Sequence, residues 1–219
     1  MPSKAFARFQ KNLETVQRLN DTYDQMKRDR NSRGRGAFDH ITRSAVVFLV
    51  SAFEVYCEDV LCEGVDWTIR SARDAVNLPN PVKSNINCFV RKESNGVPPT
   101  DLCDEGWRRI YRNMVEKQTQ FLNTPSTKKI KELFESFLGI AATELDSITD
   151  FNKLDTVISF RGEIVHRVKA TGYVHIEDVK DYICLIHNLA VNLDKAIKEH
   201  IRITYSVKAP WNDTYIPLA

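Results

Sequence analysis

Apolar residues recur at steps of three and four along most of the chain, a spacing typical of helices that bury one face. This spacing predicts helices over residues 9–26, 38–73, 107–121, 125–138, 150–168 and 176–201. Nowhere does the pattern give a convincing set of strands. The chain is therefore predicted to fold as an all-α helical bundle.

Two of these helices have distinct patterns. Residues 45–57 are apolar nearly all the way round, which is typical of a helix surrounded by others, and Glu54 is the only charge among them. The last helix instead keeps one apolar stripe along its whole length, which indicates packing in a bundle. The stripe consists of Ile176, Val179, Ile183, Ile186, Ala190, Leu193, Ile197 and Ile201.

The remaining segments carry turn-forming residues or lack periodicity. Residues 77–105 contain several prolines and a glycine, so we expect an irregular insertion on a framework of four core helices. The tail, residues 205–219, holds Trp211 and two prolines, and we expect it to pack back on the bundle or on a partner. The 219 residues together fit a single domain.

Charge is nearly balanced along the chain. Lysine and arginine total 31 against 29 acidic residues, which excludes a globally basic nucleic-acid coat and leaves only a local patch for such contacts. The longest apolar run, residues 45–50, is too short to span a bilayer, and no signal peptide is evident at the N-terminus. We expect a cytoplasmic protein without membrane contact.

Cysteine and cofactor signals are weak. The five cysteines are odd in number and form no CxxC pair, so they are interpreted as reduced thiols. No P-loop, dinucleotide fingerprint or metal-ligand spacing is present, and the sequence therefore indicates no cofactor and no metal. Trp107, Tyr111 and Trp211 are candidates for base stacking, although core or interface packing explains them as well.

The run from Arg161 to His166 (Arg-Gly-Glu-Ile-Val-His) carries the chemistry of most interest. Arginine supplies a fixed cation, and histidine is the residue type that exchanges protons near neutral pH. The spacing alone has little specificity, since Arg35 and His40 match it too. Context favours Arg161–His166, because it lies on a helix that faces the presumed core whereas Arg35–His40 follows a glycine-rich basic turn.

Helix geometry keeps the two side chains of this motif apart. Residues five apart are displaced by about 140° around the axis and roughly 7.5 Å along it. Arg161 and His166 therefore converge on one phosphate only if the arginine wraps round or if two copies meet across a two-fold axis. The alternative is that Arg161 forms a structural ion pair and His166 is an ordinary packed histidine.

Further charged residues are candidates for the same site. Glu54 is costly to bury unpaired, so its natural partner is Arg161 or His166; alternatively it points to the surface between two apolar ridges. A basic run after the first helix is a candidate grip on a nucleic-acid backbone, although a solvated charge run is the commoner explanation. It comprises Lys27, Arg28, Arg30, Arg33 and Arg35.

These features together resemble the HEPN superfamily, most closely its RiboL-PSP-HEPN and MAE-type groups. The resemblance rests on residues 52–56 with their embedded acid, on the Phe160–Arg167 run and on the long final helix. It covers residues 38–73 and 150–201 and does not extend to the insertion or the tail.

The resemblance implies a metal-independent endoribonuclease that works as a homodimer with two facing motifs, in a bacterial defence or toxin–antitoxin system. Arg161 would bind the phosphate, and His166 would act as general base or acid, giving 2′,3′-cyclic phosphate and 5′-hydroxyl ends. Arg167 would add an RNA contact. The residue after the arginine is often polar in that family; here it is Gly162, and Glu163 is the candidate for the polar role.

Two other functions remain open at this point. A catalytically silent HEPN domain would bind RNA or nucleotide as an adaptor. A helical interaction module would use the long stripe and the aromatic tail as an interface with a partner protein such as an antitoxin.

Overall fold

The computed structural model describes the chain except for residues 30–37, 93–102, 121–125, 149–150, 167–171 and 216–219. The described residues form eight α-helices and one 3-10 turn, without a strand, which confirms the all-α prediction. The elements are α1 (Lys4–Asp29), α2 (Asp39–Ser71), η1 (Ala75–Asn77), α3 (Asn80–Lys92), α4 (Gly106–Thr119), α5 (Thr127–Leu138), α6 (Ala142–Ile148), α7 (Phe151–His166) and α8 (Ile176–Tyr205).

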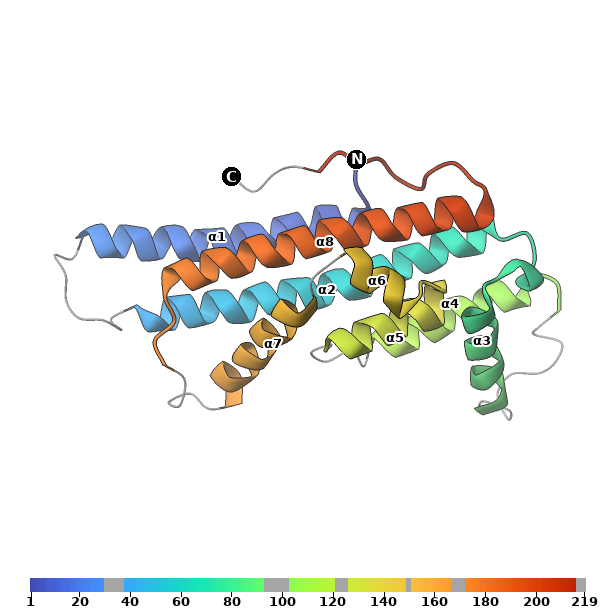
Figure 1. Cartoon of the computed structure of the whole chain (residues 1–219), viewed down its shortest axis with the longest axis horizontal. Coiled ribbons are helices and arrows are strands. Elements are labelled where there is room, and N and C mark those ends of the chain that lie inside the picture. The colour runs from blue at the N-terminus through green and yellow to red at the C-terminus, as the bar shows by residue number, and fades with distance from the viewer. Residues whose placement is uncertain (30–37, 93–102, 121–125, 149–150, 167–171, 216–219) are drawn as a thin grey trace.

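Helix α2 is the centre of the fold. Helices α1, α2 and α8 run side by side as a long frame, and α4, α5 and α7 pack against α2 from the other side (Figure 1). Helix α2 therefore has neighbours on several sides, and most apolar residues of 45–57 are buried or half-buried against them, whereas Phe48 is 53% exposed. A Cβ at Gly64 would lie 3.1 Å from Leu138 and 3.2 Å from Ile197, so the glycine permits close approach of α5 and α8.

The ends of α5 show why the chain turns where it does. The Ser126 hydroxyl accepts a hydrogen bond from the Lys129 amide at 3.3 Å and caps the first turn. At the other end Gly139 adopts a left-handed conformation with φ of 79°, and its amide donates back to Glu135. Glycine takes this conformation without the steric cost that a Cβ imposes, and the predicted helix end at Gly139 is confirmed.

The stretch predicted to be irregular contains a helix. Residues 80–92 form α3, which buries Val82 and Ile86 and packs against α5 and α4. The prolines that suggested disruption lie just before α3 (Pro79) and in its first turn (Pro81), where no intrahelical N–H donor is required. The prediction is therefore wrong for 80–92, and residues 93–102 lie outside the described part of the chain.

The tail packs back on the bundle, as one of the two predicted options had it. The Asn212 amide donates to the Met1 carbonyl at 2.9 Å, Lys198 pairs with Asp213, and the Trp211 side chain is 7% exposed. The Tyr215 hydroxyl donates to Asp194 at 2.9 Å. Both ends of the chain are thereby attached to α8.

Asp194 is the buried polar centre of that attachment. It is fully buried on α8 and accepts hydrogen bonds from the Ser3 amide at 3.4 Å, from the Ser3 hydroxyl and from Tyr215. Burial raises the pKa of Asp194, and the hydrogen bonds from Ser3 and Tyr215 oppose this rise. A carboxylate that accepts three bonds in the core stabilises the fold only while all three donors are in place.

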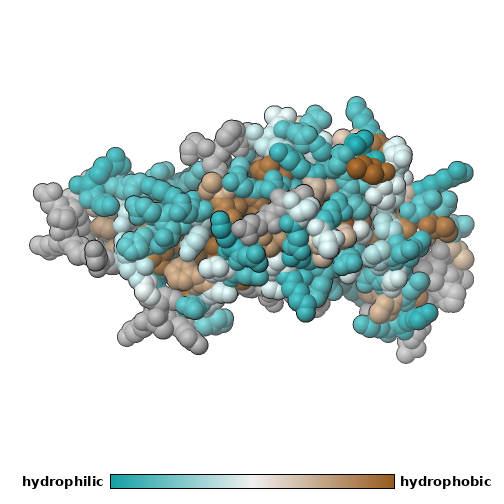
Figure 2. All heavy atoms as spheres, in the orientation of Figure 1, coloured by the Kyte–Doolittle hydropathy of each residue, from teal (hydrophilic) through white to brown (hydrophobic). Residues whose placement is uncertain are grey.

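Most of the face shown in Figure 2 is covered by hydrophilic side chains, with smaller apolar patches between them. Within the described residues, none of the helices combines the length and the apolar character needed to cross a membrane.

Replacing Asp194 by asparagine tests the role of this buried carboxylate. The amide nitrogen of asparagine cannot accept from Ser3 or Tyr215, so D194N should lower the free energy of unfolding by about 2 kcal/mol, measured by urea denaturation. The control is D181N on the exposed side of the same helix, which should change it by less than about 0.5 kcal/mol. Equal losses in both variants would contradict a special role for Asp194.

Candidate functional site

Helix α7 presents the predicted motif at its C-terminal end. It packs against α2, α5 and α8, and it buries Leu154, Val157 and Ile164. Arg161 lies four residues after Val157 and seven after Leu154, so it shares their side of the helix, and it is half-buried. His166 is the last residue of α7 and is exposed.

The motif is therefore divided between two sides of one continuous helix. Because α7 is unbroken from residue 151 to 166, Arg161 and His166 diverge by about 140° around its axis. Arg161 points toward the bundle, and its Nε is shielded from solvent. Glu163 is exposed, on the side of α7 that faces away from the bundle. One chain by itself thus presents the histidine outward and the arginine inward.

Glu54 lies on α2, the helix against which α7 packs. Its side chain is half-buried, and its Oε1 is buried and accepts no hydrogen bond from the described residues. Burial raises the pKa of Cys57 one turn on, and the charges of Glu58 and Glu54 add to that rise. A cation next to these acids would lower their electrostatic cost, and the pairing of Glu54 with Arg161 or His166 stays a prediction.

The backbone that follows the motif is fixed to the start of α2. The Val174 amide donates to Asp39 Oδ1 at 3.1 Å, and Arg43 both pairs with Asp39 and donates to the Gly172 carbonyl at 3.1 Å. These contacts hold residues 172–174, the connection that leads into α8. Asp39 and Arg43 were not among the predicted site residues, although an acid in the first turn of a helix is a recognisable signal for such a role.

The end of α1 meets the same connection. The hydroxyls of Tyr23 and Tyr173 are 3.0 Å apart, which joins the last turns of α1 to the residues before α8. Lys27 and Arg28 follow on α1 and are exposed; the Lys27 ammonium lies 5.9 Å from the Tyr23 ring centroid. These two cations are therefore at the end of the bundle where α2 begins and where residues 172–174 lead into α8.

Several predicted residues fall outside the described ranges. These are Arg30, Arg33, Arg35 and Arg167. The competing motif therefore has one described member, His40, which is exposed in the first turn of α2. Nowhere in the described ranges do three or more histidine, cysteine or acidic side chains come together as a metal site would require.

An all-α bundle that carries an arginine and a histidine near the end of the helix before its last long helix has the architecture of a HEPN-type domain. The model of the RiboL-PSP-HEPN family matches residues 8–199, and the chain belongs to this family. The predicted resemblance to the HEPN superfamily is thus confirmed, while the match concerns the family and not the Arg-x4-His pattern. Membership suggests a ribonuclease or an RNA-related HEPN domain. Comparison with curated proteins and with solved structures gives no match.

The anchor at Asp39 is open to a direct test. D39A removes the acceptor of the Val174 amide, so hydrogen exchange at that amide should accelerate about tenfold, measured by NMR. The control is D21A, an exposed position on α1 that makes no contact with the connection, and it should leave the exchange rate unchanged. Unaltered protection of Val174 in D39A would show that other contacts hold the connection.

Proposed function

We propose that this protein is a metal-independent endoribonuclease, active as a homodimer, in a bacterial defence or toxin–antitoxin system. The observation that carries the proposal is the placement of His166, exposed at the end of α7, with Arg161 one and a half turns earlier on the same helix. An antitoxin or another protein of the defence system would be the partner. The RNA contacts of the ribonuclease itself would include Lys27 and Arg28.

The chemistry follows from the properties of the two residue types. His166 takes the proton of the ribose 2′-hydroxyl, the 2′-oxygen attacks the phosphorus, and the bond to the 5′-oxygen breaks. A second histidine returns a proton to the leaving oxygen, which gives a 2′,3′-cyclic phosphate and a 5′-hydroxyl. Arg161 neutralises the charge that builds on the phosphoryl oxygens. Helix α7 of one chain supplies one exposed histidine, so the second would come from α7 of a second copy.

One face of α7 supports such a pairing. Ile158, Gly162 and Val165 are spaced by four and three residues and form a stripe on one side of the helix, with Val165 45% exposed. A Cβ at Gly162 would meet nothing within 4 Å among the described residues, so these residues give no steric reason for glycine. Glycine inside a helix costs about 0.5–1 kcal/mol relative to alanine.

Close approach by a second copy supplies the missing reason for that glycine. Two α7 helices crossing at Gly162 would bury Ile158 and Val165 of both copies. His166 is the next-turn neighbour of Gly162, so both histidines would then border one cleft. The half-buried Arg161 of each copy would face that cleft from the margin of α2.

The cleavage proposal predicts opposite results for two exposed histidines. H166A should lower the cleavage of a fluorescent RNA at least 100-fold, because proton transfer is lost, while the circular dichroism spectrum and thermal midpoint stay unchanged. H40A, in the competing motif, should cleave at the wild-type rate. EDTA should leave the wild-type rate unchanged, and the product should carry a cyclic phosphate.

Other outcomes would assign one of the alternatives. Wild-type protein that binds RNA without cutting it would favour the silent adaptor. Loss of cleavage in H40A together with full activity in H166A would assign the catalytic site to the competing motif, Arg35–His40. Activity in cells that survives H166A and R161A and disappears with interface variants would favour an interaction module.

The dimer geometry predicts that a large side chain at residue 162 is tolerated by the fold and harmful to assembly. G162L should weaken dimerisation at least tenfold by analytical ultracentrifugation and reduce cleavage in parallel, because the two helices can no longer approach closely. T156L is the matched control: it adds a leucine to the exposed side of α7 away from the stripe and should leave both quantities unchanged. A dimer of unchanged affinity in G162L would place the interface elsewhere.

A further inference from the structure

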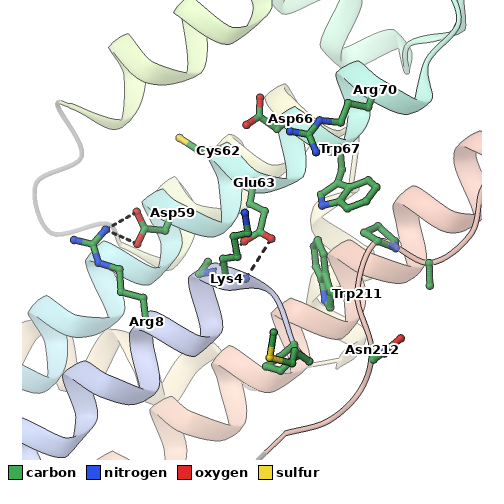
Figure 3. Close-up of a pocket in the computed structure, with 15 residues that line it drawn as sticks. Lys4, Arg8, Asp59, Cys62, Glu63, Asp66, Trp67, Arg70, Trp211 and Asn212 are labelled. Atoms are coloured by element: carbon green, nitrogen blue, oxygen red, sulfur yellow. Dashed lines mark hydrogen bonds and ion pairs between the residues drawn. The ribbon is translucent and has the colours of Figure 1, made fainter.

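A cleft lies at the opposite end of α2 from Asp39 (Figure 3). It is bounded by the start of α1, the C-terminal half of α2 and residues 209–212 of the tail, and its volume is about 670 Å³. That volume lies within the range of small-molecule sites. The residues that matter here are Lys4, Glu63, Trp67, Arg70 and Trp211, and we refer to the space between them as the tail cleft.

Two acids of the tail cleft are already engaged. The Glu63 carboxylate accepts hydrogen bonds from the backbone amides of Lys4 at 3.2 Å and Ala5 at 3.0 Å, where it caps the start of α1. Asp59 pairs with Arg8 at 3.0 Å. A cationic ligand would have to displace these contacts.

The third acid is also paired, and two cations are left over. Asp66 forms an ion pair with Arg112 of α4 at 2.8 Å. The side chains of Lys4 and Arg70 are exposed, and no carboxylate in the described part of the chain lies within ion-pair distance of either. Lys4 and Arg70 are therefore the cations of the tail cleft without a carboxylate partner among the described residues, and they are placed to meet an anionic ligand.

Aromatic surface lies next to this charge. Trp67 of α2 is half-buried and borders the tail cleft, whereas Trp211 of the tail is buried in its wall at 7% exposed (Figure 3). The Arg70 guanidinium lies 5.7 Å from the Trp67 ring centroid, so a cation and an aromatic face are presented together. Indole faces bind planar rings by stacking and accept any nucleobase.

We propose that the tail cleft binds a nucleotide, with the base against Trp67 and the phosphate held by Arg70 and Lys4. A nucleotide is the ligand class that combines a planar ring with a neighbouring anion, and arginine binds phosphate oxygens in a bidentate manner. A free nucleoside phosphate and the 5′-phosphorylated end of an RNA share this chemistry. The site lies apart from α7 and does not depend on the ribonuclease function.

Isothermal titration of the full chain with AMP, adenosine and inorganic phosphate tests the proposal. AMP should bind with a dissociation constant on the order of 10–100 µM, as expected for a small ligand that uses both contacts. Adenosine and phosphate should each bind at least tenfold more weakly than AMP. Absence of AMP binding at millimolar concentration would overturn the proposal.

Variants separate the two halves of the site. R70Q should weaken AMP at least tenfold and leave adenosine unchanged, and W67L should weaken both ligands while the circular dichroism spectrum stays that of the wild type. The matched control is R91Q, which removes an exposed arginine on α3, and it should bind AMP normally. Wild-type AMP affinity in both R70Q and W67L would overturn the assignment to the tail cleft.

The last comparison identifies the source of the nucleotide. It also tests the nucleotide site in the tail cleft independently of the ribonuclease proposal. In an H166A background a 5′-phosphorylated pentanucleotide is titrated beside AMP, each with and without R70Q. Tighter RNA binding that R70Q weakens would assign the tail cleft to RNA ends, and tighter AMP binding that R70Q weakens would assign it to a free nucleotide. H166A should bind AMP as the wild type does even though it does not cleave RNA. Loss of AMP binding in H166A would show that AMP occupies the α7 site and would overturn the proposal.

Discussion

The fold depends on the burial of one helix on nearly every side. Because residues 45–57 of α2 are apolar almost all round, no single neighbour can cover them, and α1, α8, α7, α5 and α4 all pack against α2. This requirement fixes where α7 lies and therefore which side of α7 turns inward. The inward side carries Arg161, and the end of the helix carries His166 into solvent. The chemistry of the candidate site is thus arranged by core packing.

The sequence predicted the parts of the fold that local rules determine. The all-round apolar segment of α2, the long stripe of α8 and the glycine end of α5 each follow from spacing or from the conformational freedom of one residue. Helix α3 was not predicted, because Pro79 and Pro81 were interpreted as interruptions, whereas they lie just before the helix and in its first turn. Asp194 is buried beside the apolar stripe of α8, and its partners Ser3 and Tyr215 are too distant in sequence for spacing to reveal them.

The same distinction applies to the candidate site. The motif residues and their angular separation on α7 could be predicted, because both follow from position along one helix. The link from Asp39 to Val174 and the tail cleft could not, because each joins segments more than a hundred residues apart. Periodicity predicts the position of a residue within its own helix. Contacts between segments distant in sequence can be identified only from the tertiary structure.

The attachment of the tail has a consequence for the order in which the molecule is completed during synthesis. The Met1 carbonyl accepts from Asn212 and Ser3 donates to Asp194, so residues 1 and 3 receive these partners only after residues 212 and 194 have been synthesised. Contacts of such long range form late, because they require closure of nearly the whole chain. Helices α2 and α7 can meet before that moment, whereas the tail cleft cannot exist until translation has passed its own wall, Trp211.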